Sequence, residues 1–306
     1  FTAHPHRDPG SGNLHGICYS GNKRNLVTHV TVAEDGAVVK EIDIPVKDGP
    51  SIHDCAITEN YVLIFDLPVT FSKNKFLSGY LFPYEWNPNH EARIGLLDRH
   101  SRTPTKPSWY SVDPCYVFHP CNAYEAGKDE IIVDVCSHDS MFASSTFGPD
   151  SKSIKFERWA LNASRAKFSK RTLDNSPQEF PRFDERLTGR YYRYAYTVSL
   201  NLSSKTDQYD STIIKHDLKS GRKQTHNFGA GRIPGEFVFI PKSLESQEDE
   251  GWLLGLVINV ARGETDFSIL DARNIEGPPV AEIKIPHLIP PGFHGNWVFS
   301  SELGDR

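Results

Sequence analysis

The chain has 306 residues, of which 38% are hydrophobic and 24% are charged, a globular composition that argues against disorder, collagen and coiled coil. Its formal net charge of −5 gives no electrostatic reason to expect a nucleic-acid partner. The longest apolar stretch, Trp252–Ala261, has about half the length that a membrane-spanning helix needs.

Short runs of β-branched and aromatic residues, bounded by turn residues, predict strands along the chain. In chain order they are Tyr61–Phe65, Ile131–Val135, Phe237–Ile240 and Leu253–Val260. Helical periodicity is scarce, and only Phe156–Ser169 predicts a helix, of one or two turns. Twenty-one prolines and 22 glycines also argue against a helical bundle.

One pattern recurs at long spacing: a polar residue, a turn and then a strongly apolar strand. The polar residues follow one another at intervals of 49, 66, 60, 57 and 58 residues, and they are His4, His53, His119, Glu179, Glu236 and His294. A period near 60 with several short strands per unit is typical of the four-stranded blades of a β-propeller.

About five such units fit into residues 1–306, which we interpret as a single domain. A closed propeller with this strand content would have six or seven blades, and the chain starts with Phe1 instead of Met. We therefore expect an N-terminal part to be missing.

Four of the six recurring residues are histidines. In a propeller the innermost strand of each blade faces the axis, so matched positions converge on one point. Neutral imidazole is the commonest ligand of zinc, copper, iron and nickel. Four protein ligands would close a tetrahedral zinc site, whereas an octahedral iron would keep two open positions for O₂. The two glutamates can each accept the other ring N–H of a ligand histidine, although ordinary salt bridges are an equal alternative.

Several segments resemble the signature segments of carotenoid cleavage oxygenases. They occur in the order of that family, cover nearly the whole chain, and are Thr2–Pro5 with Asp8–Pro9, His53–Tyr61, Phe118–Glu125, Glu179–Arg182, Arg190–Tyr196 and Gly292–Trp297. The resemblance implies an all-β, seven-bladed β-propeller capped by loops, of which this chain lacks the first blades. It also implies one Fe(II) on the propeller axis, held by four histidines: His4, His53, His119 and His294.

The same resemblance assigns roles around that metal. Glu179 would orient His119 and Glu236 would orient His294, while the glutamate that orients His53 would lie upstream of His4. The implied reaction is cleavage of a C=C bond of a carotenoid or apocarotenoid by O₂, giving two carbonyl products. Aromatic residues next to the recurring positions are candidates for lining a tunnel that holds this apolar polyene: Phe118, Phe293, Phe65 and Phe237. For Phe65 and Phe237, plain core packing is the stronger alternative.

Several alternatives stay open. The same chemistry on a stilbene-type phenolic is the nearest, and a retinoid isomerase has no supporting feature. A hydrolytic propeller using Ca²⁺ or Zn²⁺ is disfavoured, because calcium prefers oxygen ligands. A binding module without catalysis would leave four histidines in matched positions unexplained.

The cysteines indicate a cellular compartment. Five cysteines without a CxxC pair predict buried free thiols in a reducing environment, and no signal peptide is present. We therefore predict a cytoplasmic protein, to which the resemblance adds peripheral contact with a membrane.

Overall fold

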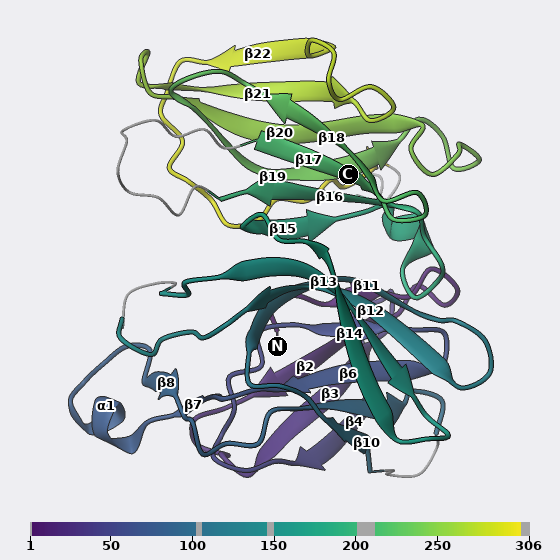
Figure 1. Cartoon of the computed structure of the whole chain (residues 1–306), viewed down its shortest axis with the longest axis vertical. Helices are drawn as coiled ribbons and strands as arrows, with labels where there is room; N and C mark the ends of the chain where they lie inside the picture. Colours follow the sequence, from purple (N-terminus) through teal and green to yellow (C-terminus); the bar gives the residue numbers. More distant parts are fainter. Residues whose placement is uncertain (1, 102–105, 146–149, 201–211, 301–306) are drawn as a thin grey trace. The chain divides into compact units, whose positions relative to one another are not determined.

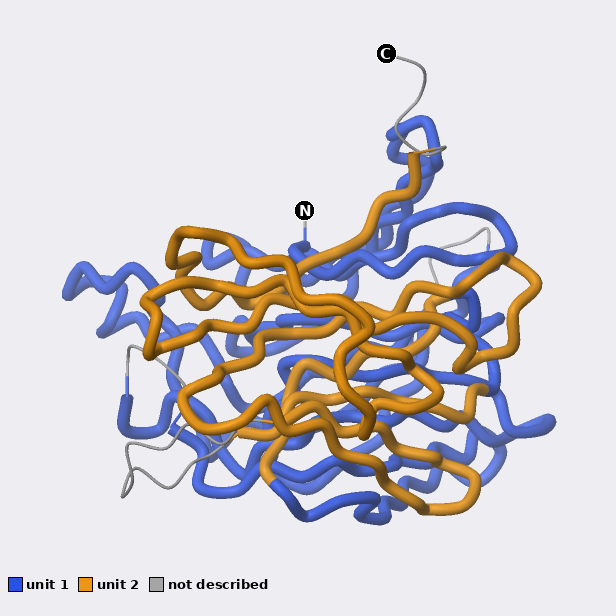
Figure 2. Tube along the Cα trace, turned by 90° about the horizontal axis from the view of Figure 1, so that it is seen from above, with its two compact units in different colours: residues 1–176, 186–191 blue, residues 177–185, 192–306 orange. Residues whose placement is uncertain are grey.

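The computed structural model describes residues 2–101, 106–145, 150–200 and 212–300, and their regular secondary structure is almost entirely β-strand (Figure 1). The chain forms two compact units, coloured separately in Figure 2. Unit 1 contains residues 1–176 and 186–191, and unit 2 contains residues 177–185 and 192–306. That residues 1–306 form a single domain stays a prediction. Within the described ranges, no helix has the length and apolarity to cross a membrane.

Unit 1 contains three four-stranded antiparallel sheets and a two-stranded ribbon. The first sheet is β1 (His6–Arg7), β2 (Leu14–Tyr19), β3 (Leu26–Val32) and β4 (Val38–Pro45). The second, in spatial order, is β5 (Cys55–Ile57), β6 (Tyr61–Asp66), β9 (Arg93–Asp98) and β10 (Ser108–Ser111). The third is β11 (Tyr116–Glu125), β12 (Glu130–His138), β13 (Ile154–Asn162) and β14 (Lys167–Asp174). Between β6 and β9 lie the ribbon of β7 (Val69–Phe71) and β8 (Tyr84–Trp86) and the helix α1 (Lys73–Leu77).

Unit 2 contains two four-stranded antiparallel sheets. One is β15 (Gln178–Arg182), β16 (Tyr194–Ser199), β17 (Thr212–Asp217) and β18 (Arg222–Asn227). The other is β19 (Arg232–Pro241), β20 (Gly251–Asn259), β21 (Glu264–Asp271) and β22 (Ala281–Ile285). A 3-10 helix, Glu185–Leu187, follows β15 in the chain.

The strand predictions are confirmed. The four predicted runs fall in β6, β12, β19 and β20. Buried residues of β6 and β12 belong to a hydrophobic core of unit 1, and those of β19 and β20 belong to the core of unit 2. The helix predicted over Phe156–Ser169 is wrong, because this segment forms the end of one strand and the start of the next. Phe156 and Trp159 are fully buried in β13, and the carbonyl of the Asn162 side chain accepts a hydrogen bond from the Arg165 N–H, which closes the turn into β14.

The first strand of every four-stranded sheet is an edge strand, and five of the six recurring polar residues lie in it or just before it. The sixth, His294, lies after β22 and outside the strands. His4 precedes β1, His53 precedes β5, and His119 lies in β11. Glu179 and Glu236 lie in β15 and β19. The repeat read from the sequence therefore corresponds to one place in each sheet.

Three of these first strands are bulged next to the polar residue. The register shifts between Val117 and Pro120 in β11, between Glu179 and Arg182 in β15, and between Pro234 and Phe237 in β19. A β-bulge interrupts the ladder and redirects a side chain, which is why bulges are common beside active sites. The local strand geometry thus sets the directions of His119, Glu179 and Glu236.

Candidate metal centre

Three histidines of unit 1 meet at one point. The Nε2 atoms of His4 and His53 lie 3.1 Å apart. The ring of His119 lies 5.0 Å from that of His4 and 5.1 Å from that of His53, between centroids, at interplanar angles of 69° and 78°. One ring nitrogen from each of the three lies within 4.8 Å of the others. The three side chains are buried or half-buried, so little water competes with them.

This arrangement fits a metal ion. Two nitrogens bound at about 2.1 Å and at right angles to each other would lie about 3 Å apart, close to the distance between His4 and His53. Three imidazole nitrogens alone would leave such an ion able to accept further ligands. A nitrogen donor set of this kind suits iron, zinc, copper or nickel, so the residues fit the iron that the sequence predicts but do not select it.

An aromatic wall adjoins the histidines. The ring of Phe118 is perpendicular to that of His53, with centroids 5.1 Å apart, and it also packs against Tyr116 at 4.9 Å. Phe142 packs on its far side at 6.2 Å. Aromatic rings therefore line the His53 side of the three nitrogens, as a site for a polyene requires.

A largely buried pair beside these ligands is not predicted from the sequence. Nε2 of His6 lies 2.8 Å from Oδ1 of Asp54, and the same carboxylate oxygen accepts a hydrogen bond from the Cys55 N–H. Burial would raise the pKa of Asp54, but the neighbouring imidazoles of His6, His4 and His119 lower it below its usual value. The available signal was the direct adjacency of Asp54 to His53 and the two-residue spacing of His6 from His4.

In unit 2, Glu236 holds His294. Oε1 of Glu236 lies 3.3 Å from Nδ1 of His294, and Oε2 accepts a hydrogen bond from the Gly295 N–H at 3.0 Å. Burial would raise the pKa of Glu236, but the His294 hydrogen bond, the Arg182 guanidinium and the Gly295 N–H lower it. Glu236 is therefore a carboxylate that engages one ring nitrogen of His294 and directs the other away.

Glu179 is also buried in unit 2, in the bulge of β15. Its Oε2 accepts a hydrogen bond from the N–H of the next residue, Phe180, which has a φ of 55°. This left-handed conformation is unusual for a bulky residue and marks a locally strained backbone.

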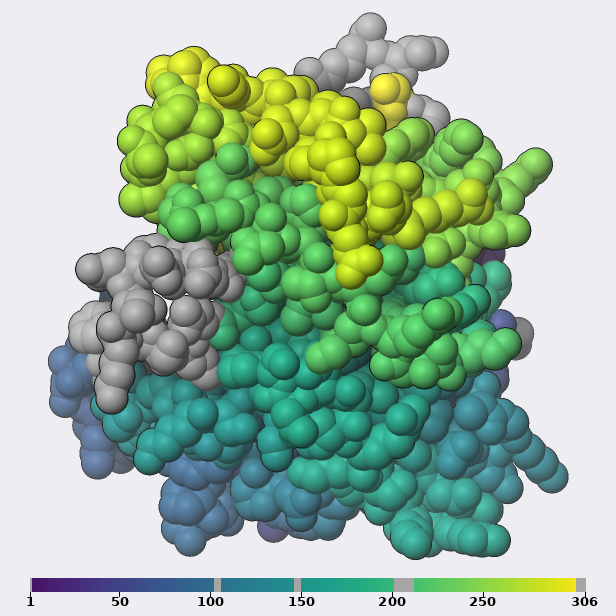
Figure 3. Space-filling model, turned by 45° about the horizontal axis from the view of Figure 1, so that its top comes forward, coloured from purple at the N-terminus to yellow at the C-terminus, as the bar shows by residue number. Residues whose placement is uncertain are grey.

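The four aromatic tunnel candidates lie in different surroundings. Phe118 lies beside the histidines, as described, and Phe293 is exposed on an apolar cavity of about 470 Å³ in unit 2 that Glu236, His294 and Trp297 also line. The last described residues of unit 2, which include this segment, are the yellow atoms of Figure 3. Phe65 and Phe237 are buried in the hydrophobic cores of units 1 and 2, so they take the alternative role of core packing.

All five cysteines are thiols outside disulfide bonds, and all but the half-buried Cys18 are buried, as predicted. Burial raises the pKa of the Cys115 thiol to about 12, which leaves it protonated and unreactive.

Sequence comparisons relate the chain to known proteins. Residues 1–299 match the family model described as retinal pigment epithelial membrane protein. A carotenoid cleavage oxygenase of Mycobacterium tuberculosis is 30% identical over 97% of this chain and 68% of its own length. A carotenoid 9,10(9',10')-cleavage dioxygenase of Pisum sativum is 29% identical over the whole chain and 59% of its own length.

Solved structures show the same fold. A cobalt-substituted apocarotenoid oxygenase of Synechocystis superposes with a TM-score of 0.85 at 26% identity, over 97% of this chain and 64% of its own. A lignostilbene dioxygenase of Pseudomonas brassicacearum superposes with a TM-score of 0.86 at 23% identity, over 97% of this chain and 66% of its own, and shows the fold alone. The chain thus spans between 59% and 68% of the lengths of these relatives. It has the all-β architecture of a β-propeller and belongs to the carotenoid cleavage oxygenase family.

Proposed function

We propose that this chain carries most of the active site of a non-haem Fe(II) dioxygenase that cleaves a C=C bond of a carotenoid or apocarotenoid with O₂. The products would be two aldehydes or ketones. The observation that carries this proposal is the meeting of His4, His53 and His119 at one point, in a chain that belongs to this family.

The chain's residues would each have a defined part. His4, His53 and His119 offer neutral nitrogen donors, so they leave the charge of a bound ion uncompensated. Such an ion supplies a site that takes up and activates O₂. Phe118 would exclude water and hold the apolar chain of the substrate near the nitrogens, which selects the bond by position.

We propose His294 as the fourth ligand. The hydrogen bond from its Nδ1 to Glu236 supports this, because a partner on one ring nitrogen fixes the tautomer and leaves Nε2 as the donor. We further propose that Glu179 gives the same support to His119, as the placement of both residues beside bulges in first strands suggests. Phe293 would line the approach of the substrate.

We also propose peripheral contact with a membrane, through the projection formed by α1 and the residues that follow it. Its exposed apolar residues are Phe76, Leu77, Tyr80 and Leu81, and Leu81 is fully exposed. Figure 1 shows α1 on a loop that projects from the strands of unit 1.

Basic residues adjoin this projection. The Arg24 guanidinium lies 5.1 Å from the ring centroid of Phe71, which packs on Phe76 at 5.6 Å, and Lys23 and Lys73 are exposed. Apolar insertion beside lysine and arginine is the chemistry that binds an anionic lipid surface. The free thiols are consistent with the cytoplasmic face of such a membrane.

The second face of the sheet β19–β22 is apolar, and this favours the presence of further blades in the complete protein. Leu253 and Val257 of β20 are buried in the core of unit 2, while Leu254, Leu256 and Ile258 point to the other face. A strand that is apolar on both faces is typical of a sheet covered on both sides. These three residues also line the cavity that Phe293 and His294 border, so we propose that another part of the complete, seven-bladed protein covers only the part of this face that lies outside the cavity. In the complete protein, the thiol of a Leu256→Cys variant should react slowly with a thiol reagent. Rapid labelling would contradict the proposal.

The decisive experiment combines metal analysis with turnover. The complete protein, purified and loaded with Fe(II), should contain about one iron per chain. Incubated in air with an apocarotenal and, separately, with a hydroxystilbene, it should give carbonyl fragments of the apocarotenal, identified by mass. Fragments of the stilbene alone would replace the substrate, and no iron with no cleavage of either would overturn the proposed function.

A further inference from the structure

Hydrogen bonds and an ion pair join the three segments of unit 1 that carry His4, His53 and His119. The joined residues lie a few positions after each histidine in the chain. The joined residues are Asp8, Thr58 and Glu125, which follow His4, His53 and His119 by four, five and six residues. None of them belongs to the group of residues that could hold the metal. They form a second layer of contacts, on the segments that carry the ligands.

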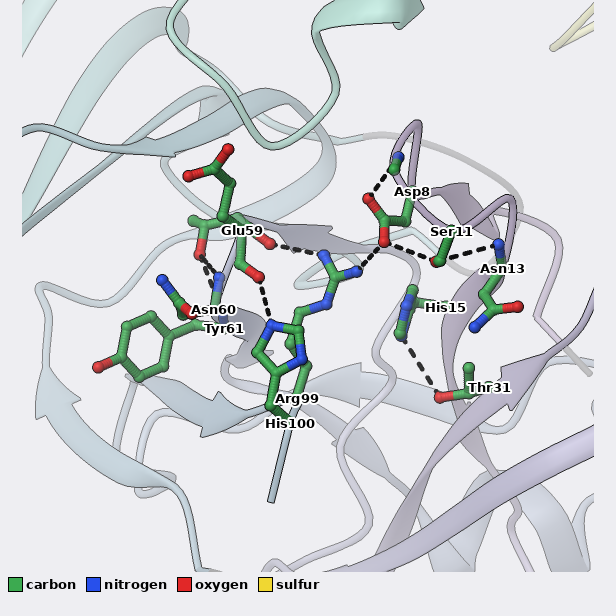
Figure 4. A network of polar contacts seen from close by, with 12 residues as sticks. Asp8, Ser11, Asn13, His15, Thr31, Glu59, Asn60, Tyr61, Arg99 and His100 are labelled. Atoms are coloured by element: carbon green, nitrogen blue, oxygen red, sulfur yellow. Dashed lines mark hydrogen bonds and ion pairs between the residues drawn. The ribbon is translucent and has the colours of Figure 1, made fainter. Parts of the chain in front are cut away.

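Arg99 connects the first two segments. It follows β9 directly and is buried, with 8% of its surface exposed. Its NH1 group donates to the carbonyl of Thr58 at 2.7 Å, and its NH2 group forms an ion pair with the Asp8 carboxylate. Figure 4 shows Arg99 between Asp8 on one side and the turn of Glu59, Asn60 and Tyr61 on the other. One guanidinium thus holds the segment of His4 against the segment of His53.

Glu125 connects the second and third segments. It is the last residue of β11, the strand that carries His119. Its Oε1 accepts hydrogen bonds from the Thr58 hydroxyl at 2.7 Å and from the Asn60 N–H at 2.9 Å. Its Oε2 accepts a third from the Asn60 side-chain amide at 2.9 Å. The turn at residues 58–60 is therefore held from both sides.

The segment of His4 has few backbone contacts, and besides the pair of His6 and Asp54 it is held by Arg99. Strand β1 pairs with β2 through only two residues, His6 and Arg7, so His4 lies outside the ladder. Asp8 ends this segment and is fixed in turn by Ser11 and by the Gly10 N–H. Burial would raise the pKa of Asp8, but Ser11, Gly10 and Arg99 lower it, so the residue is a carboxylate that pairs with Arg99.

We propose that Arg99 and Glu125 are positioning residues that set the relative placement of His4, His53 and His119. They act through the backbone of the three segments, and the proposal rests on the proposed function, in which these histidines hold the metal. A metal site needs its ligands held within about 0.5 Å of their positions, which a two-residue strand cannot achieve alone. Arginine suits this task because its planar fork donates in two directions, whereas lysine offers a single point charge.

The test uses Co(II) binding to the complete protein, because cobalt absorption bands report coordination geometry without turnover. Arg99→Lys should bind Co(II) about 10- to 100-fold more weakly than the parent, as changes behind metal ligands commonly do, and should shift the bands. Glu125→Gln should also weaken Co(II) binding, because the amide NH₂ group of glutamine would face the N–H donors of Asn60 instead of an acceptor oxygen. The double variant Asp8→Asn with Arg99→Lys should lose little more than Arg99→Lys alone.

Arg93 provides a matched control at the other end of β9. It pairs with Asp66 at 2.8 Å, but neither residue lies on a histidine-bearing segment. Arg93→Lys should lower the unfolding midpoint and leave the cobalt affinity and bands unchanged.

The outcomes separate this proposal from the proposed function. A parent protein that binds no metal would overturn the proposed function. A parent that binds cobalt, with folded Arg99→Lys and Glu125→Gln variants of equal affinity and spectrum, would overturn only the positioning role. Equal losses in Arg93→Lys and Arg99→Lys would also overturn it, since the effect would then be general destabilisation. If Arg99→Lys does not fold, Glu125→Gln decides alone.

Discussion

The imidazole rings of His15 and His29 stack inside the first sheet, with planes 4° from parallel and centroids 5.4 Å apart. Nδ1 of His15 lies 3.1 Å from Nε2 of His29, so one ring donates a hydrogen bond to the other. Burial lowers the pKa of His15 to about 3 and that of His29 to about 4, and the nearby cations of Arg99 and Lys40 contribute to both shifts. Both rings are therefore neutral in the folded protein at neutral pH.

This pair predicts a loss of stability in acid. A histidine with a folded pKa near 4 and an unfolded pKa of 6.5 stabilises the fold above pH 6.5, and this contribution disappears as the pH falls toward 4. The slope is about 1.4 kcal/mol per pH unit for each such group. In His29→Gln, the free energy of unfolding, measured by urea titration, should fall less steeply between pH 6 and 4, by up to about 1.4 kcal/mol per pH unit. The exposed His287→Gln serves as control, and an unchanged slope in His29→Gln would contradict the assignment.

Removing one ligand should abolish metal retention. His119→Ala deletes one of three converging nitrogens, and we expect the iron content of the purified protein to fall from about one per chain to near zero. Elemental analysis measures this, and His226→Gln, a change at a buried histidine of unit 2, should retain the metal. Full iron content in His119→Ala would show that the cluster is not the binding site.

The carboxylate behind His294 should matter less than a ligand. Glu236→Gln keeps the size of the side chain but removes the charge that fixes the His294 tautomer, so metal affinity should fall about 10- to 100-fold. Competition with a chelator measures the change. Affinity equal to the parent would mean that His294 needs no such partner.

The close packing of β19 on β20 predicts a glycine that cannot be replaced. A Cβ atom at Gly251 would lie 2.1 Å from the carbonyl oxygen of Ile240, a backbone atom that cannot move aside. Gly251→Ala should lower the free energy of unfolding by about 1–3 kcal/mol, as overpacking does. Gly292, which has open space around it, provides the control, because Gly292→Ala should cost little.

The projection at α1 should control association with vesicles. The double variant Leu77→Ser/Leu81→Ser should reduce cosedimentation with vesicles that contain anionic phosphatidylglycerol by about tenfold, because two exposed apolar anchors are lost. The exposed Leu244→Ser is the matched control in unit 2. Binding of the double variant equal to that of the parent would exclude this projection as the contact.

Much of the architecture is readable from the sequence because strands and repeat spacing are local or periodic signals. The run at Tyr61–Phe65 predicts β6 almost to the residue. The interval from His53 to His119 places one polar residue just before, and the other within, the first strand of a sheet. The error at Phe156–Ser169 has a local cause. Phe156 and Trp159 have helical spacing, but the bond between the Asn162 side chain and the Arg165 backbone reverses the chain.

The contacts that hold the histidine-bearing segments are harder to predict, because they join residues whose spacing in the chain does not match the repeat. Arg99 lies 91 residues from Asp8 and 41 from Thr58 in the chain, and neither interval matches the repeat. The pair of His6 and Asp54 lies beside two predicted ligands, yet His6 has no counterpart in the other repeats. Such pairs become visible only when the sheets are formed.

The three histidines belong to the first strands of three different sheets or directly precede them, and this has a consequence for folding. An ion bound to His4, His53 and His119 would close loops of 49 and 66 residues, as a pair of disulfides would. Because the unfolded chain holds no such preformed site, the binding free energy is added to the free energy of unfolding. The metal would therefore act as a reversible cross-link, and removing it should make the sheets of unit 1 melt at lower temperature and less cooperatively.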